Sequence, residues 1–271
     1  MDRRNKNYEQ GLRQAICLLV AILIGGCTEQ KRVCPPITTM QEAATVLQEY
    51  SAGLKPLKAT GNCTISYTNE KGERFAQSFP VRIWFENKNK FCLYGDVMFD
   101  PRAISFVVTG DKYWTYAKPF GIYVNGQVDM VSEDYFSNPT VLVDFLEPLG
   151  DDCGNVYMAK AEKNFNVVMC RDKEFCKTKK IFMERCSRLV KKIEYFNCAG
   201  NVMLVVEADD YRSIAGGGRV LFPHKLVYKY AQGQKNNNTM QIKLDSVRSW
   251  QSTTEQLKAL FTPPDANAIR R

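Results

Sequence analysis

The sequence predicts a mainly β (α+β) domain, in which a single curved antiparallel sheet forms an incomplete β-barrel and a few helices cover its cavity. Short alternating segments recur about every 8–12 residues between polar or glycine-containing turns, as in other antiparallel sheets. Helical periodicity is confined to three short stretches near the beginning, middle and end of the chain. A length of 271 residues with 45% hydrophobic content suits one globular domain, which we place at 39–265.

The first 26 residues have the pattern of a secretion signal. Basic residues precede an apolar run from Ala15 to Ile24, and these ten residues are too few to cross a membrane, which needs about 20. The apolar run ends in the motif Ile24-Gly25-Gly26-Cys27, which resembles a bacterial lipobox. In a lipobox, signal peptidase cuts before a cysteine that carries diacylglycerol. We therefore predict a signal peptide at 1–26, lipid attachment at Cys27 and a polar tether over 27–38. The alternative is a plain signal peptide or a short membrane anchor with an incidental cysteine.

Export changes how the charge is interpreted. Removing the leader, with its four basic and two acidic residues, lowers the formal net charge from +8 to +6. So modest an excess is typical of a solvated surface, and no recognition motif indicates nucleic acid as a partner. Thr28 stands where an Asp would retain a lipoprotein in the inner membrane of the resembling bacterial systems. We therefore predict a lipid anchor in the outer membrane, on its periplasmic side.

Eight cysteines remain after the leader and the lipid site are set aside. An even number in an exported protein can pair into as many as four disulfides, with free buried thiols as the alternative. Their spacings do not match paired CxxC knuckles, so we predict no metal site. We expect those between 153 and 198 to pair mostly with one another, and Cys63 and Cys92 to lie on strands that could be close. The eight are Cys34, Cys63, Cys92, Cys153, Cys170, Cys176, Cys186 and Cys198.

The elements follow from periodicity and from turn residues. Apolar residues at helical spacing predict a helix over 39–52, which Thr38 or Thr39 can cap. A second helix over 139–148 has proline in its first turn, and a third over 253–261 precedes a C-terminal tail at 266–271. The predicted strands span residues 59–68, 73–86, 90–97, 103–109, 112–117, 121–128, 164–170, 179–185, 189–197, 202–211, 225–231 and 240–250.

No motif in the chain indicates an enzyme. The glycine triplet at 216–218 lacks the Lys-Ser/Thr of a phosphate-binding loop, and GxSxG does not occur. The one histidine, His224, follows proline at a predicted strand start, where a surface or interface residue is the better interpretation than a general base. We predict no catalytic residues, no metal and no cofactor.

Aromatic side chains are concentrated in the first half of the predicted sheet. Alternation places Phe91 and Leu93 on one face of their strand, with Cys92 and Tyr94 on the other. These rings can fill an ordinary core, but a strongly curved sheet can also leave an apolar pocket. The candidate pocket residues are Trp84, Phe91, Leu93, Phe106, Trp114 and Tyr116.

Several segments resemble the LolA/LolB-like lipoprotein-sorting superfamily, and the order of elements does so over roughly residues 39–265. Thr109 to Pro119 is similar to the family's turn followed by an aromatic strand, and Phe79 to Trp84 to the strand before it. Arg188 to Gly200 resembles a later strand and turn, and Phe261 to Pro264 the closing segment. The cysteine content, the segment 150–185 and the glycine triplet depart from the family pattern.

The resemblance implies a hydrophobic half-barrel cavity that holds acyl chains of lipids or lipoproteins, with Arg82 as a candidate lid contact. It predicts a non-enzymatic, lipid-anchored envelope protein that takes part in lipoprotein sorting or in transport to the outer membrane. The alternative is a structural or sensory envelope lipoprotein that binds another protein through the same sheet. The sequence does not identify that protein partner.

Overall fold

The chain divides into two compact units, residues 1–35 and 36–271, and the second is described below. The predicted signal peptide, Cys27 and the C-terminal tail lie outside the described residues. Within those residues, no helix is both long and apolar enough to span a membrane. The computed structural model describes residues 34–54, 56–68, 71–128, 139–149, 155–158, 162, 164–171, 178–216, 220–231, 238–251 and 253–262.

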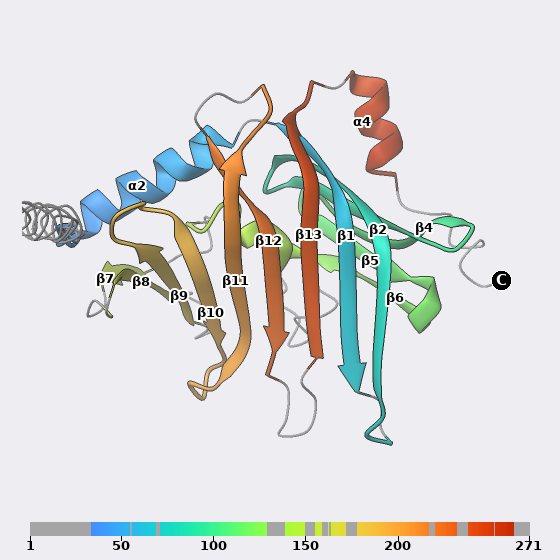
Figure 1. Ribbon diagram of the computed structural model, residues 1–271, viewed down its shortest axis with the longest axis horizontal. Coiled ribbons are helices and arrows are strands. Elements are labelled where there is room, and N and C mark those ends of the chain that lie inside the picture. The colour runs from blue at the N-terminus through green and yellow to red at the C-terminus, as the bar shows by residue number, and fades with distance from the viewer. Residues whose placement is uncertain are drawn as a thin grey trace, which may run out of the picture. The chain divides into compact units, whose positions relative to one another are not determined.

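Thirteen antiparallel strands form one sheet that does not close on itself (Figure 1), which confirms the predicted open, mainly β fold. Their order across the sheet is β6-β5-β4-β3-β2-β1-β13-β12-β11-β10-β9-β8-β7. The strands are β1 (Leu57–Thr68), β2 (Arg74–Asn87), β3 (Lys90–Val97), β4 (Asp100–Thr109), β5 (Lys112–Ala117), β6 (Ile122–Gln127), β7 (Asn155–Met158), β8 (Phe165–Arg171), β9 (Thr178–Glu184), β10 (Val190–Phe196), β11 (Val202–Ser213), β12 (Leu221–Tyr230) and β13 (Asn238–Ser249).

The sheet consists of two consecutive meanders, β1–β6 and β7–β13, which are joined in the middle by pairing of β1 with β13. Strands β6 and β7 are therefore the two edges, although they follow each other in the sequence. The chain must pass from one edge to the other between them. Helix α3 (Thr140–Asp144) lies on this connection.

Two further short α-helices are described, α2 (Met40–Gly53) and α4 (Thr254–Leu260). Helix α2 begins where the sequence predicts, because the Thr39 hydroxyl accepts a hydrogen bond from the Glu42 N–H at 3.2 Å. Helix α3 is shorter than the predicted 139–148. The Leu146 N–H turns back to the carbonyl of Val143, so a tighter turn replaces the helix after Asp144.

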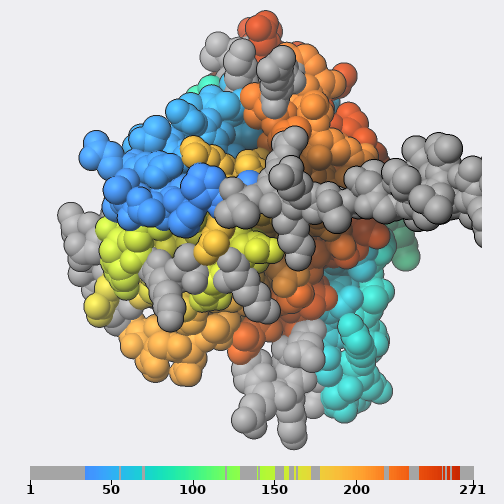
Figure 2. Space-filling view, turned by 60° about the vertical axis from the view of Figure 1, so that its left-hand side comes forward, coloured from blue at the N-terminus to red at the C-terminus, as the bar shows by residue number. Residues whose placement is uncertain are grey.

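Helix α2 packs on one face of the sheet through Ala43, Val46 and Leu47. It contacts β7, and Figure 2 shows it in blue against the yellow-green segment of the chain. Just before the helix, the buried Ile37 donates its N–H to Asn166 Oδ1 of β8 at 3.0 Å. The end of the predicted tether is therefore part of the folded domain.

Strand alternation gives the sheet two apolar faces. The inner face carries the large core, on which α2 and α3 pack, and the outer face carries a smaller cluster, on which α4 packs. The pairing of β1 with β13 has a bulge, where the register shifts between Thr60 and Gly61. A Cβ atom at Gly61 would lie 2.1 Å from the carbonyl oxygen of Lys243, so only glycine fits this position.

Among the strands whose bounds differ from the sequence prediction, β7 and β12 differ most. Strand β7 has only four residues, too few for alternation to reveal it. Strand β12 begins at Leu221, four residues before the predicted start at 225, and therefore includes Pro223. Proline has no N–H to donate to a neighbouring strand. Pro223 is tolerated because only β11 pairs with it, through Tyr211, and β13 pairs with β12 only from Lys225 onward.

Candidate functional site

Strand registers place the aromatic residues of β2–β5 in rows that run across the sheet. One row on the inner face contains Ile83, Leu93 and Phe106, and its neighbour contains Phe91. On the outer face, one row runs through Trp84, Cys92, Val107 and Trp114. The next outer row runs through Arg82, Tyr94, Ser105 and Tyr116.

The six predicted pocket residues are thus divided between the two faces of the sheet. Phe91, Leu93 and Phe106 belong to the inner core, whereas Trp84 and Trp114 belong to the outer cluster. Tyr116 lies in the outer row beside them. One cavity cannot be lined by all six, because the sheet separates them.

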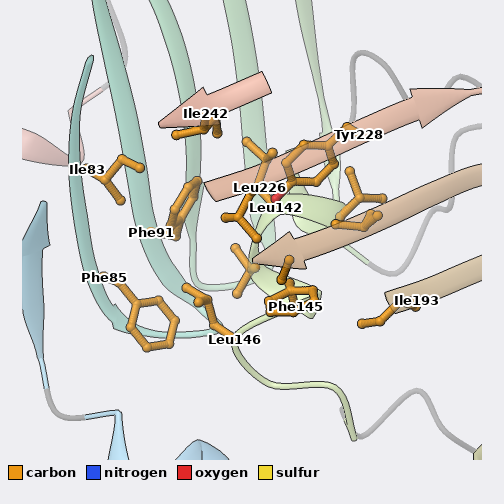
Figure 3. Close-up of a cluster of buried hydrophobic side chains, with 14 of the residues drawn as sticks. Ile83, Phe85, Phe91, Leu142, Phe145, Leu146, Ile193, Leu226, Tyr228 and Ile242 are labelled. Atoms are coloured by element: carbon orange, nitrogen blue, oxygen red, sulfur yellow. The ribbon is translucent and has the colours of Figure 1, made fainter. Parts of the chain in front are cut away.

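The inner face is apolar and is occupied by side chains of α3 and of the turn after it. Leu142, Phe145 and Leu146 project toward the sheet, where Figure 3 shows them among residues that include Phe91 and Tyr228. All three α3-segment residues are buried. The sequence prediction did not include them in the site, although the apolar run around the predicted second helix was a signal for it.

A polar contact fixes the end of α3 on the inner face. Lys179 Nζ of β9 lies 3.2 Å from Asp144 Oδ2, and the Tyr195 hydroxyl donates to the same oxygen at 3.2 Å. The Lys179 side chain is buried and Asp144 is mostly so. Because little water screens this pair, removing either charge would leave the other buried without its charged partner, which costs more than breaking a surface ion pair.

Several buried polar atoms have no hydrogen-bond partner among the described residues, and the Tyr228 hydroxyl in the inner core is one of them. Tyr228 is fully buried, and its hydroxyl has no hydrogen-bond partner within the described part of the chain. Burial raises the pKa of Tyr228 well above its usual value, and nearby acidic groups raise it further. The hydroxyl therefore keeps its proton and remains a potential donor inside an apolar region.

The outer face has its own aromatic cluster under α4. The Trp84 and Tyr94 rings meet edge to face, 5.9 Å apart, and Leu260 of α4 packs on the cluster. Lys58 lies 5.0 Å from the Trp84 ring centre, and Arg102 lies 4.6 Å from that of Tyr94. Such cation–ring contacts place positive charge along the edge of the cluster.

Arg82, the candidate lid contact, lies in an outer row next to Tyr94. Its guanidinium forms an ion pair with Asp96 at 2.6 Å and is partly exposed. The helix α3 packs on the opposite face of the sheet. The contact of Arg82 with a lid stays a prediction, and the position of α3 on the other face does not favour it.

Among the cysteines, Cys34, Cys170, Cys186 and Cys198 are disulfide-bonded. The prediction of disulfides is thus confirmed. Cys153 and Cys176 lie outside the described residues. No group of three or more potential metal ligands occurs among the residues with described positions.

Cys63 and Cys92 lie on β1 and β3, which both pair with β2, so their strands are close as expected. The two cysteines are nevertheless free and buried, and they do not pair with each other. Cys63 faces the inner core and Cys92 the outer cluster. The sheet itself lies between the two thiols. Burial raises the pKa of each to about 12.

His224 is buried in β12, contrary to the surface or interface position predicted for it. Its Nδ1 lies 2.9 Å from the carbonyl oxygen of Leu244 on β13, and Nε2 has no partner among the described groups. The paired strands therefore enclose the ring.

The turn between β3 and β4 carries two exposed apolar side chains. Met98 is 95% exposed and Phe99 102% exposed, while the strands on either side are mostly buried. Met98 has a φ of 53°, which few non-glycine residues adopt. Side chains so fully exposed contribute little to the stability of the fold.

An open antiparallel sheet whose apolar inner face is covered by helices defines a class of fold, the LolA-type fold. Comparison with solved structures agrees: a LolA superfamily protein of Nitrosomonas europaea aligns with a TM-score of 0.58 over 84% of this chain and 99% of its own, at 9% identity. A putative outer membrane lipoprotein-sorting protein domain of Vibrio parahaemolyticus gives 0.55 over 85% and 99%, at 11% identity.

A third similar structure, a DUF1329 family protein of Desulfovibrio piger, gives a TM-score of 0.58 over 86% of this chain and 100% of its own, at 11% identity. No protein-family model matches the sequence, and no curated protein matches it. At identities this low the comparisons establish only the fold. The resemblance noted in the sequence is therefore confirmed as a similarity of fold.

Proposed function

We propose that this protein is a non-enzymatic, lipid-anchored component of the bacterial envelope that binds acyl chains of lipids or lipoproteins at its inner face. One observation carries the proposal: Leu142, Phe145 and Leu146 occupy the apolar interior of an open sheet from a helix of only five residues. A lipoprotein-sorting role, with transport to the outer membrane, is the form that the LolA-type fold supports.

The energetics of exchange favour this use of α3. An acyl chain that replaces the α3 side chains buries methylene groups, each contributing about 0.8 kcal/mol. It also covers the core that α3 would expose when it moves. Because α3 is attached through Asp144 at one end, it can be displaced without breaking a strand pair. The Tyr228 hydroxyl can donate a hydrogen bond to an ester or carboxyl oxygen.

The anchor forms a separate part of the proposal. Lipid attached to Cys27 would hold the domain at the periplasmic side of the outer membrane. The Cys27→Ser change tests this by membrane fractionation and by labelling with a radioactive fatty acid. We expect the wild-type protein to incorporate label and to sediment with membranes, and the variant to do neither. Labelling of the variant would show that acylation does not occur at Cys27.

For acyl-chain binding, the test uses full-length protein extracted from membranes. Non-covalent lipids are released by organic solvent and identified by mass spectrometry, which separates them from any covalent anchor. A photoreactive phenylalanine analogue at Phe145 should then crosslink to an added fatty acid that carries a fluorescent tag. The same analogue at the exposed Phe99 is the matched control and should give far less crosslinking. The proposal fails if no lipid co-purifies and neither position crosslinks.

A second candidate function, a structural or sensory envelope protein that binds another protein through the same sheet, has one observation in its favour. The inner face of the described domain is already filled by its own α3 segment. Binding at the sheet surface would then need no movement of α3. A protein partner that co-purifies in stable stoichiometry, without bound lipid, would support this second function.

A further inference from the structure

The outer aromatic patch, which we define as Trp84, Tyr94 and Trp114 with Cys92 and Val107, lies on the opposite side of the sheet from the proposed acyl site. Within the described residues it is covered by Leu260, while Trp250 and Phe261 pack beside it. A cluster of exposed aromatic rings would be unusual on the surface of a monomer. The patch therefore depends on α4 for its burial.

Helix α4 has a small attachment to this patch. Leu260 is buried, Phe261 is partly buried, and Glu255, Lys258 and Ala259 are exposed. The Tyr94 hydroxyl donates a hydrogen bond to the main-chain carbonyl of Leu260. In Figure 1 the helix, in red, stands apart from the ladder of the sheet, so its release breaks no strand pair.

The base of α4 stays in place when the helix leaves. The Trp250 N–H donates to the Pro56 carbonyl at 2.8 Å, which ties the end of β13 to the residues just before β1. Only the segment after Trp250 has to move. The patch would then lie open beside a fixed hinge, within a sheet that is otherwise intact.

Positive charge along the edge of the patch is not neutralised. Lys58 and Arg102 lie over the rings of Trp84 and Tyr94, and no described carboxylate is within ion-pair distance of either side chain. The nearby carboxylate of Asp96 is paired with Arg82. Acidic groups on a bound molecule would therefore find two available cations here.

We propose that the outer aromatic patch is a docking surface for a short amphipathic helix of another protein, and that α4 is the resident helix which this partner displaces. The contacts of the patch define the partner by its chemistry: a leucine–phenylalanine pair covers the rings, as Leu260 and Phe261 do, and acidic residues pair with Lys58 and Arg102. The site is independent of acyl binding, since it lies on the other face of the sheet.

Release of α4 can be observed with reporters that the chain already contains. All three tryptophans, Trp84, Trp114 and Trp250, belong to or contact the patch, so intrinsic fluorescence reports on this face. The thiol of Cys92 lies in the patch, whereas that of Cys63 lies in the inner core. Local release of α4 exposes Cys92 alone, whereas global unfolding exposes both.

The Leu260→Asp variant of the full chain tests whether α4 detaches. We expect red-shifted tryptophan emission and an increase of about 10- to 100-fold in the rate of maleimide labelling at Cys92, identified by peptide mass spectrometry. Labelling of Cys63 should stay unchanged. Ala259→Asp introduces the same charge at the exposed neighbouring position and should behave as the wild type. Equal acceleration at Cys92 and Cys63, or no change at Cys92, would overturn the proposal.

A synthetic peptide of residues 251–262 then tests docking. Added to the Leu260→Asp protein, it should reverse the emission shift, while the peptide carrying Leu260→Asp should not. A peptide with Lys258→Glu should bind several-fold more tightly at low salt, and this gain should disappear in protein that also carries Lys58→Glu. The docking proposal is wrong if the wild-type peptide does not bind, or if the Lys258→Glu peptide gains nothing.

Discussion

At the scale of single residues, Tyr228 combines burial with an unsatisfied hydroxyl. The ring packs in the inner core, but no described group accepts a hydrogen bond from the oxygen. An unsatisfied buried polar group costs about 1–3 kcal/mol relative to a paired one. The protein retains a group that does not stabilise it, which is expected if the hydroxyl serves a ligand.

The Tyr228→Phe change should therefore raise the free energy of unfolding, by about 1 kcal/mol, because it removes the desolvated hydroxyl. The same change should weaken binding of a fluorescent fatty acid. Tyr195→Phe is the matched control, and it should lower stability by about 1 kcal/mol because the Tyr195 hydroxyl bonds to Asp144. Urea titration and fluorescence titration measure the two effects. A loss of stability in Tyr228→Phe would show that its hydroxyl has a partner in solution.

Sequence alternation predicted the faces of individual residues correctly where it was applied within one strand. It placed Phe91 and Leu93 opposite Cys92 and Tyr94, as the structure does. It could not relate residues on different strands, because their relation depends on the register. Trp84 was therefore grouped with Phe91, although the register aligns Trp84 with Cys92 on the outer face.

At the scale of elements, α3 is the segment on which the proposed function depends. Its position follows from topology, because the chain between edge strands β6 and β7 must return across the sheet. The sequence predicted a helix here from the proline in its first turn. It could not predict that this helix lies over the inner core, since that requires knowing that β6 and β7 are the two edges.

The ion pair of Asp144 should control the attachment of α3. In Asp144→Asn, Lys179 loses a charged partner in a buried position, so we expect a loss of about 2–3 kcal/mol in the free energy of unfolding. Asp100→Asn breaks the exposed pair of Asp100 with Lys118 and should change the free energy of unfolding far less, because water screens that pair.

The rate at which acyl chains bind is a second way to compare the Asp144→Asn and Asp100→Asn variants. If attachment of α3 limits entry, the Asp144→Asn variant should take up a fluorescent fatty acid faster than the wild type, while Asp100→Asn should not. Stopped-flow fluorescence measures both rates. Equal rates in all three proteins would mean that α3 does not need to move for binding.

At the scale of the whole molecule, stability should fall at alkaline pH. Burial raises the pKa values of Cys63 and Cys92 from about 9 to about 12, so both thiols stabilise the folded state below pH 9. That contribution is lost as the pH rises from 9 toward 12, because the unfolded state releases these protons first. Each thiol adds a slope of about 1.4 kcal/mol per pH unit.

Urea unfolding at pH 8 and pH 10.5 measures this loss. Wild-type protein should lose more stability between the two values than a variant in which Cys63 and Cys92 are both replaced by alanine. The variant is the less stable protein at pH 8, since the replacements leave small cavities. Parallel losses in the two proteins would show that the thiols are not buried in solution.

The overall architecture was the part best predicted from sequence, because a regular succession of strands and turns leaves few alternatives to an open antiparallel sheet. The pairing of β1 with β13 carried no local signal. These strands are separated in sequence by most of the domain, and neither contains a residue pattern that indicates which strand it pairs with.

That single pairing has a consequence for how the protein folds. Apart from β1 with β13, every pair of neighbours in the sheet is also consecutive in the chain. The two ends of the domain therefore meet in the middle of the sheet, and closing this long loop has the largest entropic cost of any strand pair. A circular permutant that joins β13 to β1 and opens the chain between β6 and β7 would be one continuous meander of hairpins. The mean sequence separation between contacting residues would be much smaller in this permutant. We therefore expect it to fold faster than the natural chain.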